Sequence, residues 1–450
     1  MKDERAHDAL TLAERALVQA SRAGADEAEA LVMAEDAALT RFANSQIHQN
    51  VAETNVSINL RVAIGRRIGV ASSGRTDDEG LRRLAERAVA MARVVEELPD
   101  WAGLPEPTPI EDVPAGYAPA TASASPELRA EGVRAVIAAT DAASVTAFGS
   151  FSTGTETTGV ANSKGVRVAG TRTGAQLLTV SMGPGGGTGY AESAAVDATA
   201  LDAAAIGRES AAKARATADA IAIEAGDYPV VLEEYAVVDL LDMLGYLGFS
   251  ALAVQEERSF VEIGARIGSD LMTIVDDGHD PAGLPMAFDY EGVAKQRVTL
   301  VEAGICRGVV YDAQTAARDG VASTGHGLPA PNPYGPFPMN AMMAAGDVPR
   351  DDLIRGLDRG LLVTRFHYTN PVHPKLAIIT GMTRDGTFLV EDGRIVAPVK
   401  NLRFTQSYLA AAAGVVAASR ERRTLKGFLG GVVVPALRLE SWAFTGTTEH

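Results

Sequence analysis

Residues 55–72, NVSINLRVAIGRRIGVAS, alternate between apolar and polar side chains over most of their length. The apolar positions with period two are Val56, Ile58, Leu60, Val62 and Ile64. This period is typical of a strand with one buried face, and Gly65 to Arg67 predicts a turn into a second short strand. Such a hairpin belongs to an antiparallel sheet, because parallel sheets are usually buried on both faces. We therefore expect an antiparallel sheet with one solvated side.

Both halves of the chain combine helical and strand patterns. Apolar residues have helical spacing at about 76–97, 126–143 and 197–220, whereas the second half is rich in short strands. Asp392-Gly393 separates two apolar runs and predicts a tight hairpin turn. The predicted fold class is α+β, with two domains of helices and mostly antiparallel sheets, of which the C-terminal domain is strand-rich.

The length of 450 residues favours two domains over one. We predict an N-terminal α+β domain at 1–222 that includes a Pro-rich connector at about 98–120. The C-terminal domain is expected at 223–450 and contains a helix at 236–250.

Composition excludes several classes of protein. A net charge of −16 argues against nucleic acid, whose phosphates require a basic face. The charged N-terminus is not a signal peptide, and no apolar run is long enough to span a membrane. The single cysteine, Cys306, excludes an internal disulfide. A cytoplasmic protein is the resulting expectation.

The stretch DLLDMLGYLGFSA, residues 239–251, predicts a helix with two distinct faces. Its apolar stripe comprises Val237, Leu240, Leu241, Leu244 and Leu247, and we expect Leu241 and Leu244 to be buried. Asp239, Asp242 and Tyr246 share another face. The pattern leaves open whether this second face is a catalytic site, a partner surface or a solvated side.

Motif searches identify no active site. His367 and His373 are six residues apart across Asn370-Pro371, which predicts a turn; a metal site there would need a third ligand that the sequence does not supply. The glycine-rich run GPGGGTG lacks the Lys-Ser/Thr of a phosphate-binding loop. A flexible or peptide-facing loop is the better interpretation, with Gly185, Gly186 and Gly187 as candidate peptide contacts.

Several long stretches, in order along the chain, resemble the TldD/PmbA family of metalloprotease components. They include TRFANSQIHQNVAETNVSINLRVAIGRRIGVASS and GVANSKGVRVAG in the first half. In the second half they include TIVDDGHDPAGLPMAFDYEGVAKQRVTLVEAGICRGVVYDAQTAARDGVASTGHG, GTFLVEDGRIVAPVKNLRF and VVVPALRLESWAFTG. The resemblance implies two α+β domains and a dimer that encloses a chamber where unfolded peptides are cut.

The catalytic TldD branch of this family carries His-Glu-x-x-x-His on the corresponding helix. Matching that motif at Gly245 puts Leu241 and Tyr246 at the histidine positions and Asp242 at the glutamate position. The third ligand of the branch, a cysteine, would fall near LKGFLGGVVVPAL, which contains none.

The chain thus resembles the PmbA (TldE) branch, which also lacks the zinc motif. This resemblance implies a non-catalytic subunit with no metal of its own, paired with a TldD-like partner that holds zinc. The STGHG motif has the form of this branch and adds Ser323, Thr324 and His326 as candidate peptide contacts.

Two other functions stay open at this point. The first is an active metallopeptidase with a relocated metal site that uses His367, His373 and a carboxylate such as Asp242. The second is a homodimeric peptide-binding scaffold without a protease partner.

Overall fold

The computed structural model describes residues 2–448, so residues 1, 449 and 450 of the predicted domain ranges lie outside the described residues. Its first half is built on a six-stranded sheet of order β3-β2-β1-β4-β5-β6, in which every neighbouring pair is antiparallel. The strands are β1 (Glu27–Ala43), β2 (Gln46–Ile64), β3 (Arg67–Ser73), β4 (Thr146–Asn162), β5 (Arg167–Met182) and β6 (Thr188–Ala195). The predicted hairpin is confirmed as β2 and β3, joined at Gly65 and Arg66.

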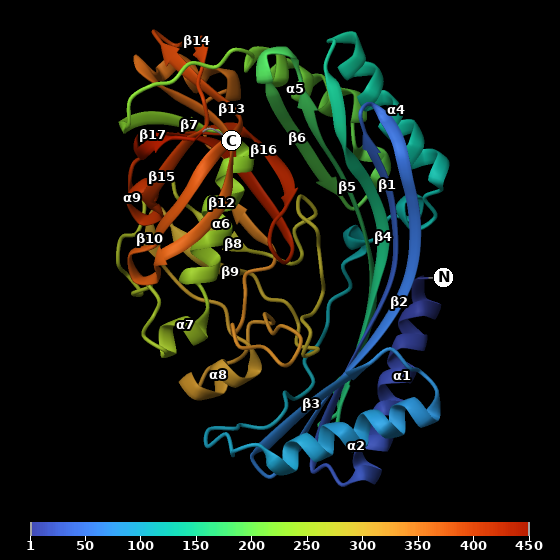
Figure 1. Ribbon diagram of the computed structural model, residues 1–450. Coiled ribbons are helices and arrows are strands. Elements are labelled where there is room, and N and C mark those ends of the chain that lie inside the picture. The colour runs from blue at the N-terminus through green and yellow to red at the C-terminus, as the bar shows by residue number, and fades with distance from the viewer. Residues whose placement is uncertain (1, 449–450) are drawn as a thin grey trace.

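Helices cover one face of this sheet, and the other face is concave and turned toward the C-terminal half (Figure 1). The helices are α1 (Lys2–Ala23), α2 (Asp78–Val94), α3 (Pro119–Ala122), α4 (Pro126–Ala142) and α5 (Ala203–Ala216). Apolar side chains of α1 and α2 pack with Ile58, Leu60 and Val62, which are fully buried. The alternation seen in the sequence therefore places its apolar face under the helices.

The C-terminal half contains an eleven-stranded sheet, part of which closes on itself. Its strands are β7 (Gly226–Leu232), β8 (Ile274–Asp276), β9 (Val298–Glu302), β10 (Ile305–Cys306), β11 (Ala341–Met343), β12 (Arg359–His373), β13 (Ile378–Glu391), β14 (Arg394–Pro398), β15 (Leu402–Ser407), β16 (Val415–Lys426) and β17 (Gly431–Thr447). β7, β12, β13, β15 and β17 form a closed ring, because β17 pairs with both β15 and β7. Only the β7–β12 and β11–β17 pairs are parallel within the described sheet.

The longest helix of this half packs against the ring. The helices are α6 (Glu234–Leu247), α7 (Ala251–Gln255), α8 (Ala313–Asp319) and α9 (Tyr408–Ala413). α6 lies against β12 and β17 and shares their apolar core (Figure 1). Short 3-10 turns occur at η1 (Pro114–Gly116), η2 (Pro184–Gly186), η3 (Ala198–Ala200), η4 (Arg350–Asp352), η5 (Ile354–Gly356) and η6 (Pro374–Leu376).

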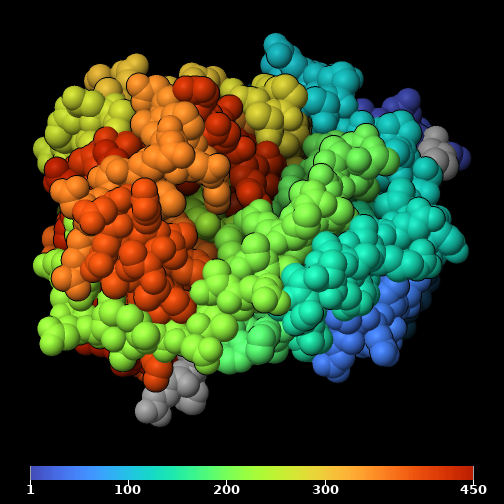
Figure 2. All heavy atoms as spheres, turned by 90° about the horizontal axis from the view of Figure 1, so that it is seen from above, coloured from blue at the N-terminus to red at the C-terminus, as the bar shows by residue number. Residues whose placement is uncertain are grey.

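The predicted α+β class is confirmed, with helices and mostly antiparallel strands in both halves. The Asp392-Gly393 hairpin is confirmed as well, since both residues have positive φ between β13 and β14. Seen from above, the light-green segment that contains α5 extends from the N-terminal part to the C-terminal part (Figure 2). The domain boundary near residue 223 stays a prediction. No helix of the described residues is long and apolar enough to cross a membrane.

Candidate functional site

Helix α6, on which the resemblance places the ligand positions of the catalytic branch, is almost completely buried. It begins at Glu234 and ends at Leu247, so the predicted range 236–250 was wrong by two residues at the start and three at the end. The error has a local cause: the backbone leaves the helical region at Gly248, where the helix ends. Leu241 is 3% exposed and Leu244 is 1% exposed, as predicted.

The three positions that would hold the zinc motif have different surroundings. Leu241 is part of the apolar core. Asp242 is buried, and its Oδ2 accepts a hydrogen bond from the backbone N–H of Phe428 at 3.0 Å. Tyr246 is 38% exposed, and its ring lies 6.2 Å from that of Tyr334. These residues therefore share a helix without converging on one point.

The turn between β16 and β17 lies directly against Asp242. This is the segment near Gly427 to Gly431 where the resemblance places the third ligand of the catalytic branch. A Cβ atom at Gly427 would lie 2.7 Å from Oδ1 of Asp242. The fold thus brings together the two segments that sequence comparison could only align separately. A side chain at 427 would require the Asp242 carboxylate and the Val432 side chain to move.

A second carboxylate, the half-buried Asp239, precedes Asp242 by one helical turn. It accepts hydrogen bonds from the hydroxyl groups of Thr369 and Tyr408, each at 2.6 Å. Burial raises the pKa of Asp239 to about 6, an effect that these two hydrogen bonds oppose. Burial likewise raises the pKa of Asp242 to about 7, opposed by the Phe428 N–H and reinforced by the nearby Asp239. The second face of the helix is therefore polar and only partly buried: Asp242 is buried, Asp239 is half-buried and Tyr246 is exposed.

The donor chemistry of this site does not fit a catalytic zinc ion. Leucine has no donor atom, and Asp242 already accepts a backbone hydrogen bond. A catalytic zinc needs three protein ligands, usually histidine, cysteine or carboxylate. Within residues 2–448, no group of three or more His, Cys, Asp or Glu side chains is arranged to hold a metal ion.

The predicted turn at His367 and His373 was wrong. Both residues belong to strand β12, which continues through Asn370 and Pro371 and pairs with β13 up to Ile378. The strand tolerates the proline because its register shifts there, between Pro371 and His373. Nδ1 of His373 accepts a hydrogen bond from the backbone N–H of Leu376.

A cleft of about 730 Å³ separates the concave face of the N-terminal sheet from the β16–β17 turn. One wall consists of residues from β1, β2, β4 and β5, and the other includes Lys426 to Gly430. Phe428 and Leu429 are exposed at this turn. Acidic and basic side chains both line the cleft, among them Glu35, Arg41, Glu53, Glu156 and Arg172. Its position next to the Asp242 segment makes it the natural approach to the candidate site.

The candidate peptide contacts lie on different elements. Gly185 and Gly186 are exposed in the turn between β5 and β6, whereas Gly187 is buried, and a Cβ atom there would lie 2.1 Å from the carbonyl oxygen of Ala214 in α5. The predicted peptide contact at these glycines stays a prediction.

The STGHG segment is half-buried at Ser323 and Thr324 and buried from Gly325 to Gly327. The His326 ring is fully buried and contacts the Thr324 hydroxyl at 2.9 Å and the Asp276 carboxylate at 2.8 Å. Lys295, also buried, donates to the same Asp276 oxygen at 3.0 Å. Ser323 bonds to the Tyr311 carbonyl oxygen. Sequence reasoning missed this buried cluster, whose members lie up to 50 residues apart.

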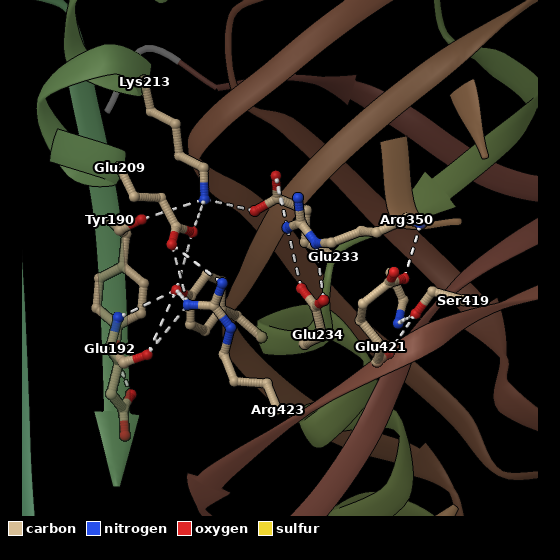
Figure 3. Close-up of polar contacts among 12 residues, drawn as sticks. Tyr190, Glu192, Glu209, Lys213, Glu233, Glu234, Arg350, Ser419, Glu421 and Arg423 are labelled. Carbon is tan, nitrogen blue, oxygen red and sulfur yellow. Dashed lines mark hydrogen bonds and ion pairs between the residues drawn. The ribbon is translucent and has the colours of Figure 1, made fainter. Parts of the chain in front are cut away.

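A network of charged side chains fixes the first turn of α6 against the N-terminal half (Figure 3). Lys213 of α5 bonds to Glu209 and to Glu233, the residue that precedes α6. Arg423 of β16 donates to Glu209 at 3.0 Å and also contacts the Tyr235 hydroxyl.

Glu234, the first residue of α6, is held by a different arginine. Arg350 forms a two-pronged ion pair with Glu234 at 2.8 and 3.0 Å. The C-terminal half thus holds Glu234 through Arg350, whereas the N-terminal half contributes to the position of α6 through the contact of Lys213 with Glu233.

Family models agree with this architecture along most of the chain. The PmbA/TldA metallopeptidase domain 1 matches residues 28–92, the central domain matches 119–218 and the C-terminal domain matches 225–446. A TldE structure from Thermococcus kodakarensis has the same fold, with a TM-score of 0.87 at 21% identity over 97% of this chain and 100% of that one.

Curated relatives match over shorter stretches. A metalloprotease TldD homologue from Haemophilus influenzae is 32% identical over 43% of this chain and 41% of that protein. A metalloprotease from Methanothermobacter thermautotrophicus is 27% identical over 50% of each chain. The chain thus matches half or less of the length of these two relatives. The fold and the matched domains define a protein of the metallopeptidase class. The chain belongs to the TldD/PmbA family.

Proposed function

We propose that this chain is a non-catalytic, TldE-like subunit of a TldD-type zinc metalloprotease that degrades or processes unfolded peptides. The observation that carries the proposal is the contact between Asp242 and Phe428. It joins the two segments expected to supply zinc ligands, and neither segment offers a histidine or a cysteine there. Zinc and the hydrolytic step would then belong to a catalytic partner.

In this proposal the subunit binds and positions the peptide. The strands that line the cleft of about 730 Å³ are long enough for an extended peptide to lie along them. The acidic and basic side chains of the cleft suit peptides of varied sequence. The ion pairs of Glu233 with Lys213 and of Arg423 with Glu209 keep α6 and β16 in a fixed relation to α5 of the N-terminal half, so the cleft is shaped before the partner binds.

Co-expression with a His-Glu-x-x-x-His homologue from the same genome tests the proposal. We expect the two chains to co-purify, and the pair to cleave casein in a reaction that a chelator stops and zinc restores. The isolated chain should bind no stoichiometric zinc and leave casein intact. About one zinc per isolated chain, with chelator-sensitive cleavage, would contradict the proposal. A chain that pairs only with itself would point to the scaffold function.

A further inference from the structure

Strand β2 has a long backbone edge that no strand covers. β3 pairs with β2 only from Ile58 to Ile64, whereas β2 itself begins at Gln46. Over 46–57, β2 has a neighbour on the β1 side alone among the described strands. This part of the strand is exposed from Gln46 to Asn55 except at Val51, which is half-buried.

The direction of the backbone groups along this edge follows from two contacts. The Ala63 carbonyl oxygen accepts a hydrogen bond from the backbone N–H of Asp26, which precedes β1, so odd-numbered residues face β1. The Val56 carbonyl oxygen lies 3.3 Å from the Cβ position of Gly74, just after β3, so even-numbered residues face the opposite side. The β1–β2 register has no shift between these residues and Gln49.

It follows that Asn50, Ala52 and Thr54 direct their N–H and C=O groups to the open edge. Side-chain contacts hold this stretch in its extended form. The Asn50 carboxamide accepts a hydrogen bond from Thr40 at 3.2 Å, and the Thr54 hydroxyl donates to Asp36 at 2.6 Å.

The edge also lacks the usual protection against pairing. Exposed edge strands of soluble proteins commonly carry proline or lysine, which oppose the addition of another strand. Residues 46–57 contain no proline, lysine or arginine. An edge that is both rigid and unprotected is suited to accept a strand from another chain.

The cleft that β2 lines indicates which molecule would add to this edge. Gln49, Val51 and Glu53, which alternate with the edge-directed residues, line the cleft of about 730 Å³. We propose that an extended peptide adds to β2 along Asn50–Thr54 by main-chain hydrogen bonds, with alternate side chains directed toward the cleft. This inference rests on the proposed peptide-binding function. Because the backbone forms the bonds, the site would accept unfolded peptides without a defined sequence.

Proline at position 52 tests the edge. In Ala52→Pro the outward N–H is lost while the β1 ladder is kept, because Ala52 does not bond to β1. Ala52→Val keeps the N–H and is the matched control. With full-length protein and a fluorescein-labelled casein peptide, we expect fluorescence anisotropy to show binding about tenfold weaker for Ala52→Pro than for Ala52→Val. Circular dichroism and the thermal midpoint establish that both variants are folded.

A second experiment changes the peptide and not the protein, so its result does not depend on the folding of a variant. Casein peptides N-methylated at every second residue lose the donors of one edge only, and we expect such methylation to weaken binding to wild-type protein. Equal affinity of Ala52→Pro and Ala52→Val, with no effect of methylation, would overturn the edge site. Partner-dependent casein cleavage that persists in that case would leave the proposed function intact. Loss of pairing with the catalytic homologue in Ala52→Pro, with unchanged peptide binding, would assign the edge to the subunit interface instead.

Discussion

Asp239 and Asp242 are carboxylates on a helix whose other side chains are mostly buried and apolar. Each is held by a few specific donors: Tyr408 and Thr369 for the first, and the Phe428 N–H for the second. Burial of a carboxylate with so few partners disfavours its charged form, which explains the raised pKa of both groups. Leu241, between them, is an ordinary core residue.

The raised pKa of Asp242 predicts a pH-dependent stability. An unfolded aspartate has a pKa of about 3.9, so between about pH 4 and 7 the folded chain binds more protons than the unfolded chain. The contribution of Asp242 to the free energy of unfolding is therefore largest at low pH and falls as the pH rises through this window. Asp242→Asn keeps an acceptor for Phe428 but cannot ionise. We expect its stability relative to wild type to increase from pH 4 to pH 7, as measured by urea unfolding.

The exposed carboxylate of Asp8 provides the control for this experiment. Asp8→Asn removes a carboxylate at the surface and should change the free energy of unfolding by no more than about 0.5 kcal/mol. A constant difference between Asp242→Asn and wild type would show that Asp242 titrates in the folded chain as it does in the unfolded chain.

Leu241→Ala should destabilise the protein by about 2–5 kcal/mol, because truncation of a core leucine loses apolar burial and leaves a cavity. The free energy of unfolding in denaturant measures this cost. Met91→Ala, which shortens an exposed apolar side chain on α2, should change stability by no more than about 0.5 kcal/mol. Similar values for the two variants would contradict the packing role of Leu241.

At the scale of elements, several helices approach the strands so closely that only glycine fits between them. A Cβ atom at Gly189 in β6 would lie 2.1 Å from the carbonyl oxygen of Ser210 and 2.5 Å from the backbone nitrogen of Ala214. Both atoms belong to the backbone of α5, which cannot move as a flexible side chain can. The distance between α5 and β6 therefore depends on this glycine.

Gly189→Ala should accordingly cost at least about 1–3 kcal/mol, the usual penalty for overpacking a core. Gly174→Ala in the neighbouring strand β5 is the matched control, since no heavy atom lies within 4 Å of its Cβ position. Thermal or urea unfolding of the two variants tests the difference. Equal stability of both would mean that α5 shifts freely on the sheet.

At the scale of the whole molecule, the two halves are joined by charged groups as well as by apolar contacts. Glu209 on α5 accepts hydrogen bonds from both guanidinium NH2 groups of Arg423 on β16 (Figure 3). Arg423 also contacts the Tyr235 hydroxyl on α6. Since these groups are largely removed from water, the loss of one partner leaves the others poorly compensated.

Arg423→Met should reduce the free energy of unfolding by about 1.5–3 kcal/mol, the range for hydrogen bonds to charged groups. Hydrogen exchange should accelerate in α5 and in the first turn of α6, where the released partners lie. Arg420→Met removes an exposed arginine from the same strand and should leave exchange in both helices unchanged. Unaltered exchange in Arg423→Met would show that the Arg423 contacts are not needed to hold α5 and α6 in place.

The sequence by itself determined the local structure. The period-two pattern at 55–72 and the Asp392-Gly393 turn each predicted a hairpin correctly, because both signals depend on neighbouring residues only. Membership of the family could also be inferred from the sequence, because the motifs of the family are contiguous stretches of the chain. The strand character of His367 and His373 was missed, since a strand with shifted register through Asn370-Pro371 is maintained by its pairing with β13 and not by local propensity.

Only the tertiary structure decided what surrounds the polar face of α6. Asp242 meets Phe428 across 186 residues, and Asp239 meets Tyr408 across 169. The same holds for the open edge of β2, which exists because β3 ends before it covers the strand. Periodicity records which face of an element is buried but not which distant segment buries it. Burial and hydrogen bonding by those distant segments set the pKa values of the carboxylates, and so these properties arise only when the chain has folded.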